Sequence, residues 1–391
     1  MTDLLTLEAA IEAVLARSEP LAGERVALEE AAGWVLAEPA LARVDLTPFE
    51  SSAMDGFALR SVDTPGRLPV VARIAAGSPA PRALRPGEAM GIATGGVVPE
   101  GADAVVPIER VVQQDDSIDV PQSVGKNDNV RPRGGDAHEG NVVLEAGTRL
   151  GAAQVGALAA AGIPELVCAR RPRVAVLATG SELRTPGETL EPGEIYEANG
   201  AMLAAALRAH GADVERLAPV RDDEDAHRDA LERALQADVV VSSGGVSVGP
   251  HDLVRRVAAE LGVEEVFWRV AVKPGKPISF GVRGATLVFG LPGNPVSTLV
   301  GFELFVRPAL RALEGERDPG PRFRQAPLAR PVRRNDARDE LVRARWRDGA
   351  LEALGGQESH MIVRAAAADV LVLVPRGDGE LAGEVSYLPL G

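Results

Sequence analysis

The stretch VVVSSGGVSVG at residues 239–249 decides the fold of this 391-residue chain. Its apolar run is typical of a buried strand, and it passes directly into two glycines and small hydroxyl residues. Further apolar runs alternate with helix-like segments on both sides of it: runs at 174–178, 214–218, 266–271 and 286–291, and segments at 199–210, 224–236, 251–261 and 296–313. This alternation predicts βαβ units and a mostly parallel, doubly wound sheet. In such sheets, ligands bind at the carboxyl ends of the strands.

The remaining segments predict further domains. Residues 6–17, 29–37 and 151–162 have helix-like patterns. From residue 44 onwards, short β-branched runs broken by Gly, Pro and Asp clusters predict a β-rich region. After the linker-like stretch DPGP at 318–321, residues 322–391 alternate strand-like runs with turns, which predicts a small β-barrel. At roughly 150 residues per domain, the length allows two to four domains.

The composition excludes several classes of protein. The formal net charge of −14 disfavours general nucleic-acid binding. No apolar run approaches the roughly 18 residues of a membrane span, and the N-terminus lacks the features of a secretory signal. We therefore expect a cytoplasmic protein that does not bind membranes. The single cysteine, Cys168, excludes an intrachain disulfide and is expected to be a buried apolar residue. The histidines lack the spacing of a zinc site.

The glycine-containing loop after residues 239–242 is the first candidate binding site. Ser243, Gly244, Gly245 and Ser247 are small enough to let backbone N–H groups point at an anion. The alternative is an ordinary strand-to-helix turn with Asp252 as the helix N-cap.

Carboxylates follow three of the strand-like runs. Glu182 follows the first run, Asp222 and Asp223 follow the second, and Asp252 follows the glycines. Carboxylates gathered at one sheet edge repel one another unless they share a cation, so this arrangement favours Mg²⁺. The alternative for Asp222 and Asp223 is that they only cap the helix-like segment at 224–236.

Two proline-containing loops follow the next runs. Lys273 and Lys276 are two of only three lysines in the chain, and they share the stretch KPGKP. Ammonium groups on a rigid loop suit a phosphate or another oxyanion, although a solvated turn is the alternative. In LPGNPVS, Pro292 and Pro295 bracket Gly-Asn and stiffen a loop at a helix start.

Eight stretches, taken together and in order, resemble the molybdopterin molybdenumtransferases, the MoeA family that includes the C-terminal domain of gephyrin. They are SSAMDGFA (51–58), ATGGVVPEGADAVV (93–106), NVRPRGGDAHEG (129–140), ATGSEL (178–183), VSSGGVSVGPHD (241–252), KPGKPISFG (273–281), LPGNPVS (291–297) and QESHM (357–361). The resemblance implies the last step of molybdenum cofactor synthesis, in which adenylylated molybdopterin and molybdate give molybdenum cofactor and AMP with Mg²⁺. It also implies a homodimer and a transient contact with the molybdopterin adenylyltransferase.

The same resemblance implies four domains and a set of site residues. The domains are a split N-terminal domain (1–43 with 138–168), an inserted β-rich domain (44–137), a MogA-like α/β domain (169–317) and a C-terminal β-barrel (318–391). The active site is expected between the α/β domain of one subunit and the inserted domain of the other. The implied catalytic residues are Asp55, Asp136, Glu182 and Asp252, of which Asp55, Glu182 and Asp252 are expected to hold Mg²⁺. The implied substrate-binding residues are Thr94, Arg133, Asp222, Ser243, Gly244, Gly245, Ser247, Lys273, Lys276, Pro292, Pro295 and Ser359.

The chain departs from the family pattern in places and leaves two alternative functions open. Ser181 stands where the family often has Asp, and the residues at 198 and 251 differ as well. Because related α/β domains share the SGG loop, a molybdopterin adenylyltransferase is one alternative, against which the segments 51–136 and 322–391 argue. A scaffold protein similar to gephyrin is the other alternative.

Overall fold

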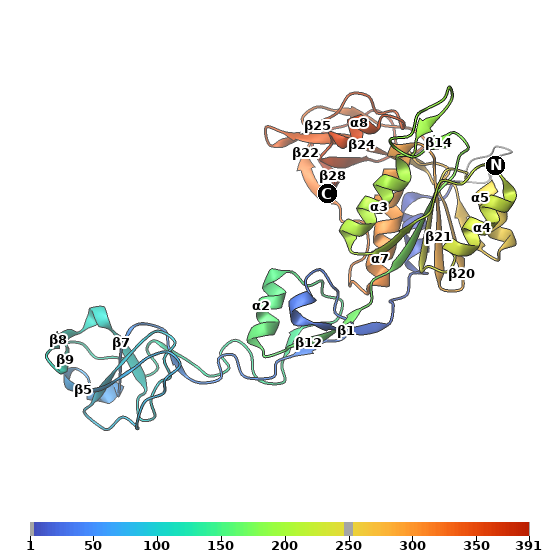
Figure 1. Ribbon diagram of the computed structural model, residues 1–391. Helices are drawn as coiled ribbons and strands as arrows, with labels where there is room; N and C mark the ends of the chain where they lie inside the picture. Colours follow the sequence, from blue (N-terminus) through green and yellow to red (C-terminus); the bar gives the residue numbers. More distant parts are fainter. Residues whose placement is uncertain (1–3, 246–252, 391) are drawn as a thin grey trace. The chain divides into compact units, whose positions relative to one another are not determined.

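The computed structural model describes residues 4–245 and 253–390, which form two compact units. One unit runs from Arg25 to Val167, and the other contains the residues before and after it (Figure 1). The four-domain division expected from the sequence is finer than this division and stays a prediction. In the described part of the chain, no helix is both long and apolar enough to cross a membrane.

A six-stranded sheet in the order β16-β13-β17-β21-β20-β18 forms the centre of the larger unit. Its strands are β13 (Arg173–Ala178), β16 (Asp213–Arg216), β17 (Val239–Ser243), β18 (Glu264–Trp268), β20 (Ser279–Arg283) and β21 (Thr286–Leu291). The first four strands in spatial order are parallel, as predicted. The last two are antiparallel to their neighbours, which the sequence did not predict. Only Gly284 and Ala285 separate β20 from β21, too few residues for the crossover that a parallel neighbour requires.

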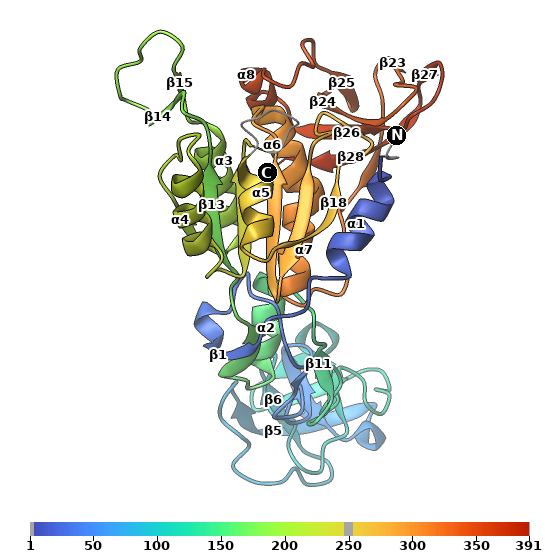
Figure 2. The same cartoon turned by 90° about the vertical axis from the view of Figure 1, so that its right-hand side faces the viewer.

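Helices cover both faces of this sheet, which confirms the doubly wound α/β fold (Figures 1 and 2). The helices are α3 (Asn199–His210), α6 (Pro295–Gly301) and α7 (Arg307–Leu313) on one face, and α4 (Glu224–Ala234) and α5 (Leu253–Glu260) on the other. Successive residues of β13 alternate between the two faces: Val176 packs into the core with α3, whereas Leu177 packs with α4 and α5. The N-terminal helix α1 (Leu7–Leu15) packs against α7.

Two helix predictions need correction. The segment predicted as one helix at 296–313 contains a π-helical turn, Phe302–Val306, between α6 and α7. Pro308 lacks the N–H group that an α-helix would bond to residue 304, so the hydrogen-bond pattern changes there. The helix predicted at 29–37 is wrong: a single 3-10 turn, Leu28–Glu30, forms instead. Gly33 has a φ of 86° and donates its N–H to the Leu150 carbonyl at 2.7 Å, which turns the chain away from a helix.

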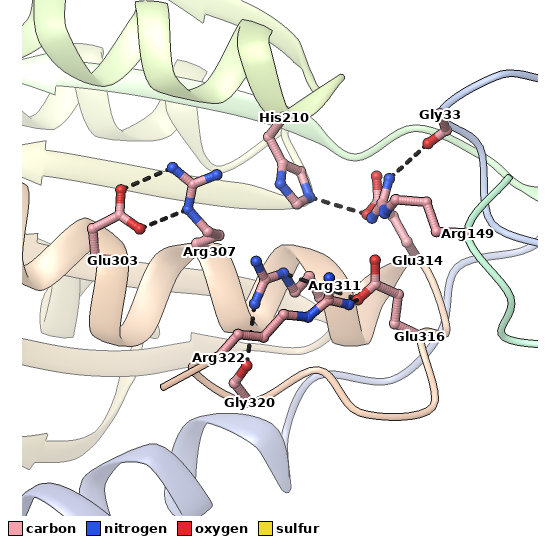
Figure 3. A network of polar contacts seen from close by, with 10 residues as sticks. All are labelled: Gly33, Arg149, His210, Glu303, Arg307, Arg311, Glu314, Glu316, Gly320 and Arg322. Atoms are coloured by element: carbon pink, nitrogen blue, oxygen red, sulfur yellow. Dashed lines mark hydrogen bonds and ion pairs between the residues drawn. The ribbon is translucent and has the colours of Figure 1, made fainter. Parts of the chain in front are cut away.

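Buried carboxylates fix the chain that follows α7 (Figure 3). His210 Nε2 lies 3.0 Å from Glu314 Oε2, and Arg322 donates to Glu316 at 2.5 Å. Both glutamates are buried, so each needs such a partner to offset the loss of hydration. The chain before the stretch expected to be a linker is therefore held to α3, and the chain after it is held to Glu316.

A second sheet builds the C-terminal region. Its path is β19-β24-β26-β28-β22, and β25 pairs with β24. The strands are β19 (Val272–Lys273), β22 (Arg324–Pro327), β24 (Asp339–Arg347), β25 (Ala350–Ala353), β26 (Val370–Val374) and β28 (Glu384–Pro389). A bridge between Leu328 and Leu351 connects the chain after β22 to β25 and closes the sheet, which agrees with the predicted small barrel. Smaller elements are β23 (Val332–Arg333), β27 (Glu380–Leu381) and α8 (Ile362–Ala366).

The unit Arg25–Val167 contains a six-stranded sheet in the order β7-β4-β6-β5-β9-β8. Its strands are β4 (Gly56–Leu59), β5 (Gly66–Ile74), β6 (Ala89–Ile92), β7 (Ala104–Pro107), β8 (Val112–Gln114) and β9 (Ser117–Val120). The chain enters and leaves the unit through β1 (Gly23–Ala27) and β12 (Glu165–Ala169). The other elements are β2 (Ala40–Leu41), β3 (Ser51–Ser52), η2 (Ser61–Asp63), η3 (Ile108–Arg110), β10 (Val130–Arg131), β11 (Val142–Leu144) and α2 (Ala152–Ala160).

Gly56 at the start of β4 gives a test of this packing. A Cβ atom at Gly56 would lie 2.0 Å from the Val106 carbonyl oxygen, which is backbone and does not move aside. We expect Gly56→Ala to lower the free energy of unfolding by about 1–3 kcal/mol, measured by denaturant titration. The matched control is Gly156→Ala inside α2, where nothing lies within 4 Å of the new Cβ. That change should raise the free energy of unfolding by about 0.5–1 kcal/mol, and equal effects of the two changes would contradict the packing described.

Candidate functional site

Three loops meet at the carboxyl ends of the parallel strands β13, β17 and β21. Thr179 after β13 donates its N–H to the Ser243 carbonyl at 3.0 Å, and Gly244 after β17 donates its N–H to the Leu291 carbonyl at 3.0 Å. The loop after β21 continues through Pro292 to Pro295 at the start of α6. These bonds hold the predicted glycine-containing loops side by side, at the sheet edge where ligands of this fold class bind.

The two glycines of the SGG loop have a packing role of their own. Gly244 and Gly245 have φ values of 92° and 63°, which disfavour any other residue. A Cβ atom at Gly244 would lie 2.6 Å from the Thr179 carbonyl oxygen, and one at Gly245 would lie 2.7 Å from Val254 Cγ2. The Gly244 N–H is already used by the strand edge. The other predicted members of this region, Ser247 and Asp252, lie outside the described residues.

Asn199 connects two of these loops and was missed by the sequence analysis. Its Nδ2 group donates to Ser243 Oγ and to the Gly293 carbonyl, both at 2.7 Å. Just before it, the buried Glu197 accepts the Gly200 N–H at 2.6 Å and pairs with Arg216. The local sequence shows only a polar helix start, because the contacts of Asn199 reach residues far away along the chain.

The predicted carboxylates at this edge have different partners. Asp222 forms a reciprocal pair with Ser181: its Oδ2 accepts the Ser181 N–H at 3.2 Å, and its N–H donates to Ser181 Oγ at 2.9 Å. Asp223 caps α4 by accepting the Ala226 N–H, which confirms the capping alternative for that residue. Glu182 is exposed immediately before the short strand β14 (Leu183–Arg184), which pairs with β15 (Ile195–Tyr196).

The two lysines of the KPGKP stretch differ in their surroundings. Lys273 belongs to β19, and its Nζ lies 3.0 Å from Glu340 Oε1. Lys276 is exposed, while its carbonyl accepts the Val270 N–H at 3.0 Å and fixes the backbone of the loop. Among the described residues, no carboxylate pairs with the Lys276 ammonium, so this side chain is available to bind a ligand.

The loop that carries Ser359 reaches the sheet edge as well. The Val296 N–H at the start of α6 donates to the Ser359 carbonyl at 3.0 Å, which brings Ser359 close to Pro295. Pro292 is held by Thr298, whose hydroxyl donates to the Pro292 carbonyl at 2.7 Å.

Arg343 shapes the loop around Ser359 from inside and was missed by the sequence analysis. Its side chain is almost fully buried, at 1% exposure. Its guanidinium donates to the carbonyls of Gly356, Glu358 and Met361 at 2.8, 3.2 and 2.9 Å. The signal in the sequence is an arginine inside the otherwise apolar run 341–344. Because three carbonyls depend on one side chain, Arg343 fixes the position of the Ser359 loop.

In the unit Arg25–Val167, three of the quoted stretches lie against one another. β3 pairs with β10, so residues 51–52 lie next to 130–131. Gly95 donates its N–H to the Ser52 carbonyl at 2.8 Å. Asp55 lies between these segments and accepts both the N–H and the hydroxyl of Thr94, at 2.7 and 2.9 Å. These two hydrogen bonds lower the pKa of Asp55, so the exposed carboxylate is ionised well below neutral pH.

Arg133 and Asp136 share a turn that Asp45 holds in place. Arg133 Nε donates to Asp45 Oδ2 at 2.5 Å, and the Glu139 N–H donates to Asp45 Oδ1 at 2.9 Å. The hydrogen bonds from the Glu139 N–H and from Arg133 lower the pKa of Asp45. The Asp136 N–H donates to the Leu46 carbonyl, and Asp136 is exposed. The sequence analysis did not single out Asp45, since one acid in a polar stretch carries no signal of these distant partners.

The predicted residues thus gather in two sets, one in each compact unit. Asp55, Thr94, Arg133 and Asp136 belong to Arg25–Val167, and the others that are described belong to the larger unit. Among the described residues, no three His, Cys, Asp or Glu side chains come close enough together to hold a metal ion. Of the predicted set, Asp55 and Glu182 belong to different units and Asp252 lies outside the described residues, so the set stays a prediction. Cys168 is buried, as expected, and burial raises the pKa of its thiol to about 11, which makes it a poor nucleophile.

Three family models match successive parts of the chain. The MoeA N-terminal region (domain I and II) matches residues 5–162, a probable molybdopterin binding domain matches 175–312, and the MoeA C-terminal region (domain IV) matches 325–389. Together they cover most of the sequence in family order.

Named relatives and solved structures agree with these models. Molybdopterin molybdenumtransferase 2 of Mycobacterium tuberculosis is 38% identical over 374 residues, covering 91% of this chain and 92% of the relative. Molybdopterin molybdenumtransferase of Staphylococcus aureus is 32% identical over 385 residues, covering 95% and 92%. Two crystal structures of the molybdopterin biosynthesis MoeA protein from Pyrococcus horikoshii superpose with TM-scores of 0.88 and 0.83, at 28% and 32% identity and over at least 99% of each chain. The chain therefore belongs to the MoeA family of molybdopterin molybdenumtransferases.

Proposed function

We propose that this chain inserts molybdate into adenylylated molybdopterin and releases AMP and molybdenum cofactor in a Mg²⁺-dependent reaction. The family is one of transferases of molybdenum cofactor biosynthesis. The observation that carries the finer proposal is the meeting of the predicted glycine- and proline-containing loops at one sheet edge. The loops after β13, β17 and β21 are bonded together there, and the Ser359 loop joins them through the Val296 N–H.

The residues at this edge suit an anionic, phosphate-bearing substrate. Cleavage of a phosphoanhydride needs charge neutralisation and positioning more than a covalent nucleophile. The Lys276 ammonium is exposed on a fixed loop and supplies positive charge for an oxyanion. Asn199 keeps Ser243 and Gly293 in place, so the polar groups of both loops are held before the substrate arrives.

The carboxylates fit Mg²⁺ by their donor chemistry. Mg²⁺ prefers oxygen ligands, and proteins commonly hold it through one or two carboxylates and the substrate phosphates. Asp55 is ionised, and only its Oδ1 atom accepts the Thr94 hydrogen bonds, so Oδ2 remains for a cation. Glu182, which belongs to the site residues of the larger unit, is exposed. When bound, Mg²⁺ would offset the charge of the phosphates. Asp136 and Arg133, held by Asp45 and Leu46, would orient the phosphates from the Arg25–Val167 unit.

The partners expected from the sequence belong to the same proposal. They are a second copy of the chain in a homodimer and a transient contact with a molybdopterin adenylyltransferase, with no nucleic acid or membrane, in the cytoplasm. The homodimer part of the proposal rests on the family resemblance, which implies an active site that draws on two subunits. Light scattering of the purified chain tests the dimer.

The decisive experiment supplies adenylylated molybdopterin, molybdate and Mg²⁺ and measures AMP release together with cofactor formation. We expect both products in equal amounts, and no AMP when Mg²⁺ is removed with EDTA. ATP and molybdopterin, given to the same preparation, test the adenylyltransferase alternative. A folded dimer that releases no AMP from adenylylated molybdopterin would refute the proposed function.

Asp55→Asn tests the carboxylate of the Arg25–Val167 set. The amide keeps the size of the side chain but removes the charge that faces the substrate. We expect kcat to fall about 100-fold or more, in the range typical of a group that acts in the transition state. The control is Asp103→Asn, because Asp103 is a carboxylate of the same unit that accepts, among the described residues, from the backbone and hydroxyl of Ser61. If Asp55→Asn keeps full turnover, Asp55 does not belong to the site.

Lys276→Ala tests the oxyanion side of the site. Loss of one ammonium contact should raise the KM for molybdate about tenfold, which corresponds to roughly 1.4 kcal/mol. Lys126→Ala removes another exposed lysine, from the other unit, and should leave this KM unchanged. If the KM for molybdate of the Lys276 variant is unchanged, Lys276 does not contact the anion.

A further inference from the structure

The pairing of two strands fixes Glu340 next to Lys273. Lys273 on β19 and Glu340 on β24 are partners in the parallel pairing of the two strands. The Asp339 N–H donates to the Ala271 carbonyl at 3.1 Å, and Asp339 Oδ1 accepts the Arg376 N–H at 2.8 Å. The start of β24 is therefore fixed on both sides, and strand register sets the distance between Lys273 and Glu340.

The side chains of Lys273 and Glu340 differ in how much of their surface is exposed. The Lys273 side chain is 43% exposed, whereas the Glu340 side chain is only 12% exposed, and their charged atoms lie 3.0 Å apart. The glutamate thus holds the ammonium from the protein side, and solvent reaches the ammonium from the other. A carboxylate at this distance offsets most of the positive charge that an approaching anion would meet.

Both residues line a cavity of about 570 Å³ between the KPGKP stretch and two loops of the C-terminal barrel. The Gly377 N–H donates to the Asn335 carbonyl at 2.9 Å, and the Arg334 N–H donates to the Gly379 carbonyl at 2.9 Å, so the two loops are joined. The charged side chains in the described lining are balanced: Lys273, Arg333, Arg334, Asp336, Glu340 and Asp378. An oxyanion in this cavity therefore meets as many carboxylates as cations.

We infer that Glu340 is a positioning residue that limits the affinity of the KPGKP stretch for oxyanions by holding the ammonium of Lys273. This inference rests on the proposed function, in which molybdate is the oxyanion. An oxyanion that is to be transferred has to leave its first binding position, and very tight binding there slows the later steps. Lys276, which no described carboxylate holds, is the lysine that binds the anion in the unmodified protein. Lys273 contributes only the charge that Glu340 leaves uncompensated.

The test is the direct binding of molybdate alone to the full-length chain, measured by equilibrium dialysis or calorimetry. Glu340→Gln keeps the shape of the side chain and its ability to accept from Lys273, but removes the negative charge. We expect the variant to bind molybdate about 3–10-fold more tightly, with sulfate binding increased as well. Local damage to the fold does not produce a gain in affinity. In turnover, the KM for molybdate should fall while kcat does not rise.

Two further variants give the control and the link to Lys273. Glu352→Gln removes a carboxylate of the same barrel that pairs with Arg345 and Arg347. Glu352 is not among the described residues that line the cavity. It should leave molybdate binding unchanged. The double variant Glu340→Gln with Lys273→Met has the same net charge at this position as the unmodified protein, so its affinity should return to the original value.

Three results would overturn the inference. If Glu340→Gln binds molybdate with unchanged or weaker affinity, Glu340 does not limit the affinity. A double variant that binds as tightly as Glu340→Gln shows that Lys273 does not carry the gain. An equal gain in Glu352→Gln shows a general charge effect. Because binding of molybdate alone needs no turnover, failure of the AMP-release assay would refute the proposed function and leave these three outcomes to decide on Glu340.

Discussion

Two backbone hydrogen bonds, Thr179 to Ser243 and Gly244 to Leu291, hold the ends of three parallel strands together. They extend the parallel pairing by one residue beyond the ends of β13 and β17. A Cβ atom at position 244 would clash with the Thr179 carbonyl and one at 245 with Val254, which explains the two glycines by packing. The positions of Asn199, Pro292 and the Ser359 loop all depend on this edge, since each contacts a loop that the two bonds fix.

The strand pair β19–β24 has a comparable role for the C-terminal barrel. It is parallel and joins the segment between the α/β strands β18 and β20 to β24, the longest described strand of the barrel. The lysine loop therefore takes its position from two sheets at once. Arg343, one position along β24 from the cavity-lining Val342, points to the opposite side and supports the Ser359 loop. One face of β24 thus contacts the lysine loop through Glu340, and the other supports the Ser359 loop through Arg343.

Much of the fold could be predicted from patterns that are local in the sequence. Alternating apolar runs and helix-like segments are enough to recognise the doubly wound sheet, and turns between short strands indicate the barrel. Residues such as Asp55 and Thr94 could be named because they lie in distinctive stretches, although no local pattern shows that Thr94 donates twice to Asp55. The errors have physical causes: Gly33 takes a left-handed φ in a helix-like segment, and Pro308 changes the hydrogen bonding inside a long helix. Asp45, Asn199, Glu340 and Arg343 were missed because their partners are distant in sequence, so that only the folded chain brings them together.

The arrangement of the larger unit has a consequence for biosynthesis. Helix α1 is synthesised long before α7, yet its buried residues Leu7, Ala10 and Val14 belong to the same core as Leu310 and Leu313 of α7. The backbone of Leu21 is likewise bonded to the Leu313 carbonyl, at 2.7 Å. During translation, the unit Arg25–Val167 leaves the ribosome complete while α1 still lacks its partner, because domains generally fold as units from the N-terminal side. The apolar face of α1 consequently lacks its partner helix until α7 has been synthesised, so the core of the larger unit is completed only late in translation.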